Sequence, residues 1–347
     1  MSNKPVVVTE PAAVAALKRI HETIGPDFLE WDFSTPGRVK ARDGSLTASK
    51  GALTGLVLSG HEEWKDENSF ILTYLIRDLS LLADLTDLKT LTLLDNGISD
   101  LSPLAGLPNL TELELECNFI KNLSPLADLT KLTKLTLGNN KISDLSPLAG
   151  LTNLTELILE DNKISELSPL AGLAKLADLD LSCNKISDLS PLAGLTKLTE
   201  LNLYGNKISD LSPLVSLMKL ADLDLGSNKI SDLSPLAGLV NLKKLSLSCN
   251  KISGLSPLAK LKKLVELELF KNKISDLSPL AGLKKLTILY LSGNKISELS
   301  PLAEPGLLEL ASIYLADNPA TDLSPLSRLP KLSSVNGEEY KRPRGKK

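Results

Sequence analysis

The chain has 347 residues, of which 42% are hydrophobic but only 3% aromatic, and its formal net charge is −3. A core must therefore be built from leucine and isoleucine, and the balanced charge gives no overall field that would attract nucleic acid or an anionic membrane. No apolar run is long enough to span a bilayer.

Residues 1–51 are predicted to form a helical cap over the start of the remaining chain. A helix is expected from Pro11 to Ile24, because apolar residues recur at helical spacing and a Gly-Pro pair follows. The segment from Phe28 to Phe33 is expected to pack in the same cap. Charged residues and prolines interrupt the N-terminus, which argues against a secretory signal and leads us to expect a cytoplasmic protein. The apolar face of the helix consists of Val14, Leu17, Ile20, His21 and Ile24.

Residues 52–330 are predicted to form one array of stacked repeats, because the sequence repeats itself at a fixed period. The first repeat is degenerate and carries a charge-rich insertion at 62–75. Eleven regular repeats follow, each marked by an asparagine that recurs after 22 residues nine times and then after 24. The two extra residues fall near Glu304 and Pro305. The asparagines are Asn96, Asn118, Asn140, Asn162, Asn184, Asn206, Asn228, Asn250, Asn272, Asn294 and Asn318.

Each regular repeat is predicted to begin with a short strand and a turn. Leu201 and Leu203 alternate with polar residues, which is typical of a strand with one buried face. Asn206 is expected to bond backbone groups of the turn with its side-chain amide. Stacked repeats would then stack these amides into a ladder.

The second half of each repeat is predicted to contain a brief helical or 3-10 turn. Ser212 is expected to cap it and Pro213 to occupy its first position, with Leu214 and Leu217 facing inward. No single repeat can bury its leucines alone, so the repeats must stack and the ends need caps. The predicted fold class is α/β: a solenoid with a curved parallel sheet on its concave face and short turns on its convex face.

The repeat L-x-x-L-x-L-x-x-N followed by x-I-S-D/E-L-S-P-L-A resembles the 22-residue leucine-rich repeat of the SDS22-like and internalin-like class, over about residues 85–330. Residues 329–340, LPKLSSVNGEEY, are similar to the closing cap of intracellular SDS22-like proteins. Residues 331–347 are therefore interpreted as a C-terminal cap and a basic tail, which is also weakly similar to a nuclear import signal. Internalins share the repeats but are exported, with a signal peptide and further surface domains that we do not expect here.

The strand positions between the leucines are expected to face the concave side, where the repeats differ from one another. Two columns, which start at Thr90 and Thr92, hold ten acids and two lysines, a sum of −8. The rest of the chain sums to +5. This concentration of acid favours a surface that attracts a basic partner, although charged residues are also ordinary occupants of solvated strand positions.

Aromatic residues are expected beside these acids, an arrangement typical of binding hot spots. The alternative is that the last tyrosines contact the C-terminal cap. The residues predicted to bind a partner are Glu112, Glu114, Glu156, Asp178, Asp180, Glu200, Tyr204, Asp222, Asp224, Glu266, Glu268, Phe270, Tyr290 and Tyr314.

A nucleic-acid groove is not predicted. The lysines that follow the asparagines, from Lys141 to Lys295, have acids three residues later, so we expect two rows of charge that screen each other. The cysteines Cys117, Cys183 and Cys249 lie 66 residues apart, which is too distant for a disulfide at ordinary strand spacing.

Catalytic and metal sites are not predicted either. The only histidines, His21 and His61, lie in no motif with a nucleophile. Paired acids such as Asp178 and Asp180 are expected to keep ordinary pKa values on an open face, and acids spread over a sheet do not form a calcium loop. We therefore expect no cofactor and no enzymatic activity.

The sequence thus favours a monomeric, non-catalytic scaffold that binds another protein, with neither nucleic acid nor membrane as a partner. The resemblance implies a narrower function: a regulatory subunit that holds a serine/threonine phosphatase on its concave face. The alternatives are an exported adhesin of internalin type and a structural spacer.

Overall fold

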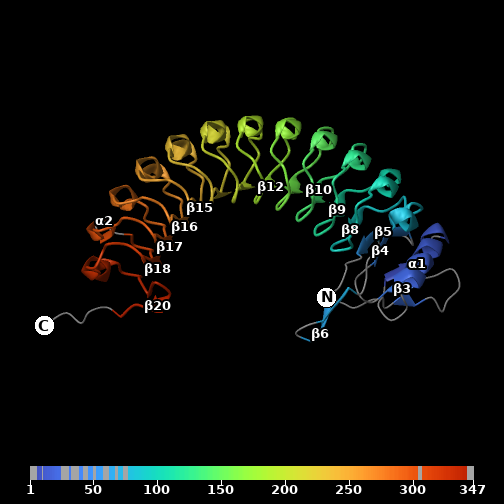
Figure 1. Ribbon diagram of the computed structural model, residues 1–347, viewed down its shortest axis with the longest axis horizontal. Helices are drawn as coiled ribbons and strands as arrows, with labels where there is room; N and C mark the ends of the chain where they lie inside the picture. The colour runs from blue at the N-terminus through green and yellow to red at the C-terminus, as the bar shows by residue number, and fades with distance from the viewer. Residues whose placement is uncertain are drawn as a thin grey trace. The chain divides into compact units, whose positions relative to one another are not determined.

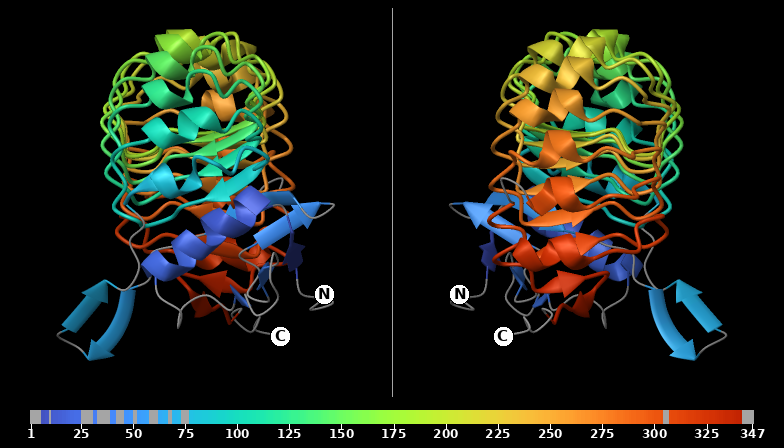
Figure 2. Two further views of the ribbon diagram at one scale, coloured as in Figure 1. Left: turned by 90° about the vertical axis from the view of Figure 1, so that its right-hand side faces the viewer. Right: turned by 90° about the vertical axis from the view of Figure 1, so that its left-hand side faces the viewer.

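The computed structural model divides into two units by contacts between residues, Met1–Leu176 and Ala177–Lys347, and each is described here by itself. In each unit the strands line one side of the repeats and the 3-10 turns line the other (Figure 1), and successive repeats overlie one another when seen from the side (Figure 2). The structure describes residues 6–9, 11–24, 31–32, 39–41, 46–49, 52–57, 62–66, 69–72, 77–303 and 307–341.

The predicted N-terminal helix is confirmed as α1, Pro11–Ile24. Val14, Leu17 and Ile20 of its predicted apolar face are buried, and His21 is half-buried. The helix contacts the first 3-10 turn, η1, Leu79–Leu82, and an ion pair joins Arg19 of the helix to Asp84, two residues after the turn. This placement supports its interpretation as a cap. Most of the segment from Phe28 to Phe33 lies outside the described residues.

The description of residues 1–51 as a helical cap is incomplete, because strands accompany the helix. One antiparallel sheet has the order β1-β3-β2, and β4 pairs antiparallel with β5. The strands β1 to β4 are too short to show a clear alternation of polar and apolar residues, so periodicity alone did not predict them, whereas β5 belongs to the predicted degenerate repeat. Their bounds are β1 Val6–Val8, β2 Trp31–Asp32, β3 Val39–Ala41, β4 Leu46–Ser49 and β5 Ala52–Val57.

The predicted insertion contains a two-stranded antiparallel hairpin, β6 Glu62–Asp66 with β7 Ser69–Leu72. The parallel sheet of the first unit then continues from β5 to β8 and through β9 and β10 to β11. The remaining elements of this unit are β8 Thr90–Thr92, η2 Ser102–Gly106, β9 Glu112–Glu114, η3 Ser124–Leu126, β10 Lys134–Thr136, η4 Ser146–Leu148, β11 Glu156–Ile158 and η5 Ser168–Leu170.

The second unit repeats the same order of strand and 3-10 turn, with parallel pairing from β12 to β19. One short α-helix, α2, replaces a 3-10 turn just before the two extra residues, which lie outside the described part of the chain. The elements are β12 Asp178–Asp180, η6 Ser190–Leu192, β13 Glu200–Asn202, η7 Ser212–Ser216, β14 Asp222–Asp224, η8 Ser234–Gly238, β15 Lys244–Ser246, η9 Ser256–Lys260, β16 Glu266–Glu268, η10 Ser278–Leu280, β17 Ile288–Tyr290, α2 Ser300–Ala303, β18 Ser312–Tyr314, η11 Ser324–Arg328, β19 Ser334–Val335 and β20 Glu338–Glu339.

The core consists of leucine and isoleucine side chains that recur at the same positions in every repeat. In the repeat of β13, Leu203, Leu214 and Leu217 are 0% exposed. Each leucine therefore contacts its equivalents in the neighbouring repeats, and the predicted solenoid is confirmed as the fold class. The same packing recurs from one repeat to the next because the residues that form it are the same.

The predicted ladder of asparagine amides is confirmed. Asn228 accepts a hydrogen bond at Oδ1 from the backbone N–H of Ile208, at 2.9 Å. Its Nδ2 donates to the carbonyl oxygens of Leu203, Leu225 and Gly226, at 2.9, 3.1 and 3.0 Å. One buried side chain thus satisfies backbone groups of two adjacent repeats that have no partner in the sheet.

The residue before each of these asparagines has a left-handed backbone conformation. Cys183 and Ser227 have φ of 53°, and Gly205 has φ of 69°. Non-glycine residues adopt this conformation at a cost, and β-branched residues adopt it least readily. All three cysteines occupy this position, with φ between 53° and 56°.

The predicted serine caps are wrong: in most repeats an aspartate two residues before the serine makes the capping bond, and Asn122 does so before Ser124. Asp210 accepts at Oδ1 from the backbone N–H of Ser212 at 2.8 Å and at Oδ2 from its hydroxyl at 2.8 Å. Ser212 is itself the first residue of η7, so its backbone N–H needs an acceptor and its side chain cannot cap it.

The C-terminal cap is an antiparallel hairpin of β19 and β20 that closes the parallel sheet of the second unit. Its turn is Asn336-Gly337, and both residues have positive φ, 54° and 85°. Asparagine followed by glycine favours this tight type of hairpin turn. The predicted cap is thus a hairpin, while residues 342–347 of the basic tail lie outside the described part.

Candidate protein-binding surface

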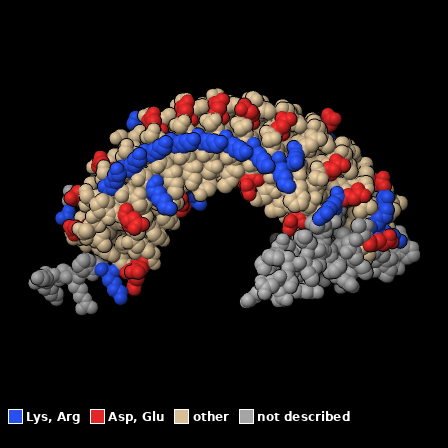
Figure 3. All heavy atoms as spheres, viewed as in Figure 1, with Lys and Arg blue, Asp and Glu red and all other residues tan. Residues whose placement is uncertain are grey.

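The row of lysines after the asparagines is exposed, and Figure 3 shows a line of basic side chains in each unit, set apart from acidic ones. The two rows were expected to screen each other, and among residues 177–303 no salt bridge joins them, so this screening does not involve ion pairs. Instead, hydrogen bonds from Ser190 and its backbone hold the pKa of Asp188 below its usual value. The six lysines of the second unit, called the lysine row below, are Lys185, Lys207, Lys229, Lys251, Lys273 and Lys295.

In the first unit, the predicted acidic side chains are largely paired already. Lys134 Nζ lies 2.9 Å from Glu114 Oε1 and 3.4 Å from Glu156 Oε1. The hydrogen bond that Lys134 donates to Glu114 raises the pKa of Lys134. Glu112 is exposed and lies level with Lys134 on the neighbouring strand. Glu114 and Glu156 therefore share one lysine, whereas no salt bridge is found between Glu112 and Lys134.

At the start of the second unit, neutral groups bond Asp180. Asp180 accepts at Oδ1 from the backbone N–H of Ser182 and at Oδ2 from Asn202 Nδ2, both at 2.8 Å. Asp178 lies level with Glu200, which is exposed. The charge on these strands is oriented but not neutralised by these bonds.

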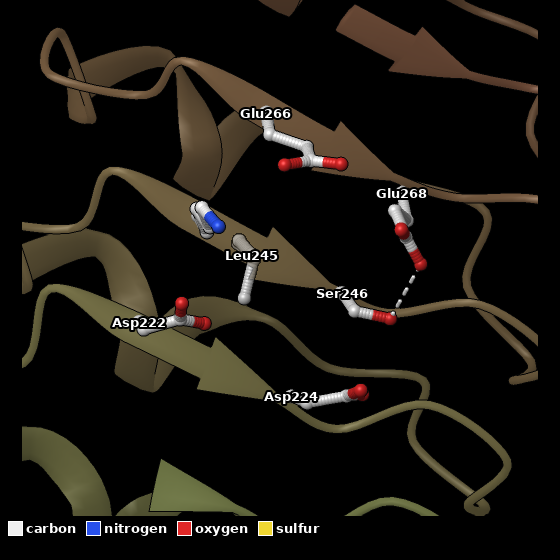
Figure 4. A pocket seen from close by; sticks show the side chains of 7 residues that line it. Asp222, Asp224, Leu245, Ser246, Glu266 and Glu268 are labelled. Carbon is white, nitrogen blue, oxygen red and sulfur yellow. Dashed lines mark hydrogen bonds between the residues drawn. The ribbon is translucent and has the colours of Figure 1, made fainter. Parts of the chain in front are cut away.

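Three adjacent strands of the second unit, β14, β15 and β16, form a pocket of about 240 Å³. In Figure 4 two aspartates project from one outer strand and two glutamates from the other, with the middle strand between them. We call this site the acidic pocket. Its lining residues are Asp222, Asp224, Lys244, Leu245, Ser246, Glu266 and Glu268.

The acidic pocket holds four carboxylates and one ammonium group, a formal charge of −3. Lys244 lies level with Asp222 on one side and Glu266 on the other. It makes no ion pair within 4.0 Å in the described part of the chain, in contrast to Lys134. Ser246 Oγ donates to Glu268 Oε2 at 3.0 Å, and the backbone N–H of Gly226 donates to Asp224 Oδ1 at 2.8 Å. The pocket therefore keeps an excess of negative charge.

Burial raises the pKa of Asp222, Asp224 and Glu268. Nearby Lys244 partly opposes this effect at Asp222, and the hydrogen bond from Gly226 opposes it at Asp224. The expectation that acids on this face keep ordinary pKa values is wrong for these residues, because the neighbouring strands shield them from water. A cation from a partner would relieve this unfavourable burial of charge.

A pair of tyrosines continues the row of outward-facing side chains beyond the acidic pocket. Tyr290 lies level with Glu268 on one side and Tyr314 on the other. The two rings are stacked, with centroids 4.6 Å apart and planes at 11°. Tyr314 also lies next to Gly337 of the C-terminal hairpin, so the predicted alternative of a cap contact applies to it as well.

The other two predicted aromatic residues lie just after their strands. Tyr204 is 41% exposed and its ring lies over Gly226, so close that an added Cβ there would be 2.9 Å from Tyr204 Cδ2. Phe270 is half-buried after β16. Of the predicted acids, the structure therefore brings Asp222, Asp224, Glu266 and Glu268 together in the acidic pocket. The predicted acids of the first unit and of β12 and β13 do not line it. The sequence prediction did not include Lys244 and Ser246, although both stand in the same columns.

No alternative site for chemistry emerges from the described residues. No three His, Cys, Asp or Glu side chains among them come together as metal ligands. None of the described helices is long and apolar enough to cross a bilayer. His61 lies outside the described part of the chain.

Binding to the acidic pocket is expected to weaken as the pH falls below 7, and to do so at a higher pH than that at which ordinary carboxylates become protonated. The raised pKa values of Asp224 and Glu268 mean that protonation, and loss of negative charge, begins at a higher pH than usual. Isothermal titration calorimetry with a basic partner should show a several-fold rise in Kd. In the variant Asp224→Asn/Glu268→Gln this pH dependence should largely disappear; an unchanged dependence would contradict the assignment.

Comparison with known proteins identifies the repeats. The family model described as leucine-rich repeats in two copies matches residues 108–150, 152–194, 196–238, 240–282 and 262–304. No curated protein sequence gives a significant match. Many solved structures are similar.

An internalin of Listeria monocytogenes is 34% identical, with 85% of this chain and 92% of the internalin covered and a TM-score of 0.72. A leucine-rich repeat protein of Leptospira interrogans is 28% identical, with 74% and 73% covered and a TM-score of 0.63. The ectodomain of a plant membrane receptor kinase from Arabidopsis thaliana, solved in complex with Casparian strip integrity factor 2, is 23% identical, with 74% and 36% covered and a TM-score of 0.62; it shows a similar fold only.

Proposed function

Because the chain belongs to the family of leucine-rich repeat proteins, we propose that it is a non-catalytic scaffold whose acidic pocket and tyrosine pair bind a protein with a basic surface. The observation that carries this proposal is the cluster of four carboxylates around a single lysine without an ion pair. The sheet holds these groups in place before a partner arrives, so that binding requires little further ordering.

An arginine or lysine side chain of the partner fits the acidic pocket by charge. Its cation would lie among carboxylates whose raised pKa values reflect burial without a sufficient counter-charge. The apolar part of the same side chain, or a neighbouring residue, would pack on Tyr290. Removing one member of such a buried charge pair costs about 2–5 kcal/mol of binding free energy.

The test is affinity capture with the native chain and with the variant Glu266→Lys/Glu268→Lys/Tyr290→Ala. The protein captured by the native chain should be lost, and its Kd measured with purified components should rise at least about 100-fold. The measurement pairs capture with quantitative mass spectrometry and then with calorimetry.

A charge-matched control separates this site from general electrostatics. The variant Asp128→Lys/Glu298→Lys changes the net charge by the same amount as the two glutamate substitutions, at exposed residues outside the strands. Its Kd should stay within about threefold of the native value. Equal losses in both variants, or none in either, would refute the acidic pocket as the binding site.

The resemblance to SDS22-like proteins supports a narrower proposal, namely a cytoplasmic regulatory subunit of a serine/threonine phosphatase. Recovery of such a phosphatase by the native chain and its loss with the pocket variant would support this function. Recovery of a different basic protein with the same dependence would contradict the phosphatase hypothesis alone and leave the scaffold function intact.

The similarity to an internalin favours a second candidate, a surface adhesin. The observation is 34% identity over 85% of this chain and 92% of the internalin. Fractionation of cells that produce the protein distinguishes the two: an adhesin is found at the cell surface, and a phosphatase regulator in the soluble fraction.

A further inference from the structure

A cluster of lysines lies where the chain enters three consecutive strands of the second unit. Five of these residues stand between the 3-10 turns η8, η9 and η10 and the strands β15, β16 and β17, the sixth is the last residue of η9, and all are exposed. Because parallel strands start on the same side of a sheet, the segments lie next to one another. We call this cluster the basic edge; it consists of Lys243, Lys260, Lys262, Lys263, Lys284 and Lys285.

The charge of the basic edge is not neutralised. The segments 234–243, 256–265 and 278–287 contain no acidic residue. Lys262 Nζ donates to the carbonyl oxygen of Gly282 at 3.2 Å and Lys263 Nζ to Asn241 Oδ1 at 2.7 Å, and both acceptors are neutral. None of the six lysines forms an ion pair within the described residues. The edge therefore presents a net positive surface on a chain that is negative overall.

Exposed apolar side chains continue the basic edge along the same column of the repeats. Met218 and Val240 are 45% and 42% exposed and hold the positions that Lys262 and Lys284 hold in the next repeats. Val215, on the turn before Met218, is 57% exposed. The preceding repeat has the small polar Thr196 at this position, and the repeat after Lys284 has Leu308, which is 45% exposed. Exposed apolar residues therefore flank the lysines along this column.

The opposite edge of the same unit differs in both respects. Five of the six lysines in the lysine row are followed three residues later by an acid; these acids are Asp188, Asp210, Asp232, Asp276 and Glu298. The sixth repeat has Gly254 at that position. The serines between the lysines and acids are exposed and polar. The lysine row therefore has the same number of lysines, but acids stand close to five of them and no apolar side chains continue the row.

We propose that the basic edge, with Val215, Met218 and Val240, binds the surface of a membrane that contains anionic lipids. Lysines close to such a surface each strengthen binding by about fivefold, and apolar side chains gain by entering the boundary between headgroups and acyl chains. A nucleic acid or an anionic polysaccharide would match the lysines but leave the methionine and valines without a partner, and no aromatic side chain stands among the lysines to stack on bases. This surface uses none of the residues of the acidic pocket.

Sedimentation with extruded vesicles tests the proposal on the full chain. One set of vesicles contains phosphatidylcholine alone and the other a mixture of phosphatidylcholine and phosphatidylglycerol. The chain should bind the mixed vesicles and not the neutral ones, and high salt should weaken binding strongly because it screens the charges. The variant Lys262→Gln/Lys263→Gln/Lys284→Gln/Lys285→Gln should lose at least about 100-fold in apparent affinity.

The lysine row supplies the matched control, since Lys207→Gln/Lys229→Gln/Lys251→Gln/Lys273→Gln removes the same charge from exposed residues. This control should bind within about threefold of the native chain. The variant Met218→Ser/Val240→Ser should weaken binding about tenfold with all lysines retained. Circular dichroism confirms that each variant is folded.

Three results would overturn the proposal: no binding to the mixed vesicles, equal losses in the two lysine variants, or no effect of Met218→Ser/Val240→Ser. Heparin and a single-stranded DNA oligonucleotide serve as soluble polyanions. If either competes through the basic edge while the apolar variant behaves as the native chain, the site is one for a soluble polyanion and the membrane assignment is wrong.

Discussion

Replacing Asn228 with alanine is expected to lower the free energy of unfolding of the second unit by about 3–5 kcal/mol. The side chain is 9% exposed, accepts from the backbone N–H of Ile208, and donates to the carbonyls of Leu203, Leu225 and Gly226. Alanine leaves these backbone groups buried without partners, and each such group costs about 1–3 kcal/mol.

Urea unfolding followed by circular dichroism measures this effect. Asn241→Ala is the control, because Asn241 is only partly buried and its side chain bonds exposed groups, the carbonyl of Met218 and the ammonium of Lys263. Its loss should cost less than about 1 kcal/mol. If the two variants unfold at the same urea concentration, the amide ladder does not stabilise the repeats in the way its geometry indicates.

Replacing Leu223 with alanine is expected to lower the free energy of unfolding by about 3–5 kcal/mol. Leu223 is 0% exposed in β14 and lies level with Leu201 and Leu245 on the neighbouring strands. The removed atoms leave a cavity that the two neighbours cannot fill without moving from their own repeats. Thermal unfolding should show a clear fall in Tm.

Leu308→Ala serves as the matched control for this substitution, since Leu308 is 45% exposed. The same chemical change there should cost less than about 1 kcal/mol, because little apolar surface is buried. A loss at Leu223 as small as that at Leu308 would mean that the repeats adjust to a missing leucine, in conflict with a closely packed core.

The sequence was sufficient to predict the repeating core and its hydrogen bonds. The spacing of the leucines specifies which side chains face inward. An asparagine that recurs directly after each strand is typical of a side chain that bonds the unpaired backbone groups of a turn. It was insufficient for the cap at Asp210, because an exposed aspartate that bonds a nearby backbone N–H has the same sequence pattern as one that screens a lysine. The N-terminal strands were missed because they are short and form their pairs outside the repeat.

The sequence pattern was also insufficient to predict which acids of the candidate site form ion pairs. Lys134 and Lys244 stand in the same column with acids on both sides, yet only Lys134 is paired. The diagonal neighbour that pairs with Lys134 is Glu114, whereas the equivalent neighbour of Lys244 is Asp224. Aspartate is shorter by one methylene, and this one is bonded to the backbone of Gly226. Side-chain reach accounts only for the diagonal pair, because Glu266 stands level with Lys244 as Glu156 does with Lys134 and is equally long, yet Glu266 forms no ion pair with Lys244. Column patterns do not contain either difference.

The uniform packing from one repeat to the next has a consequence for inheritance. Recombination between two near-identical stretches of the gene adds or removes 22 residues and leaves every core contact of the same kind as before. The outward-facing side chains are not protected in this way, since the acidic pocket needs β14, β15 and β16 in that order. Loss of the repeat that carries Lys244 would preserve the fold and abolish the pocket. The fold therefore tolerates changes in the number of repeats, whereas the binding surface must be maintained by selection.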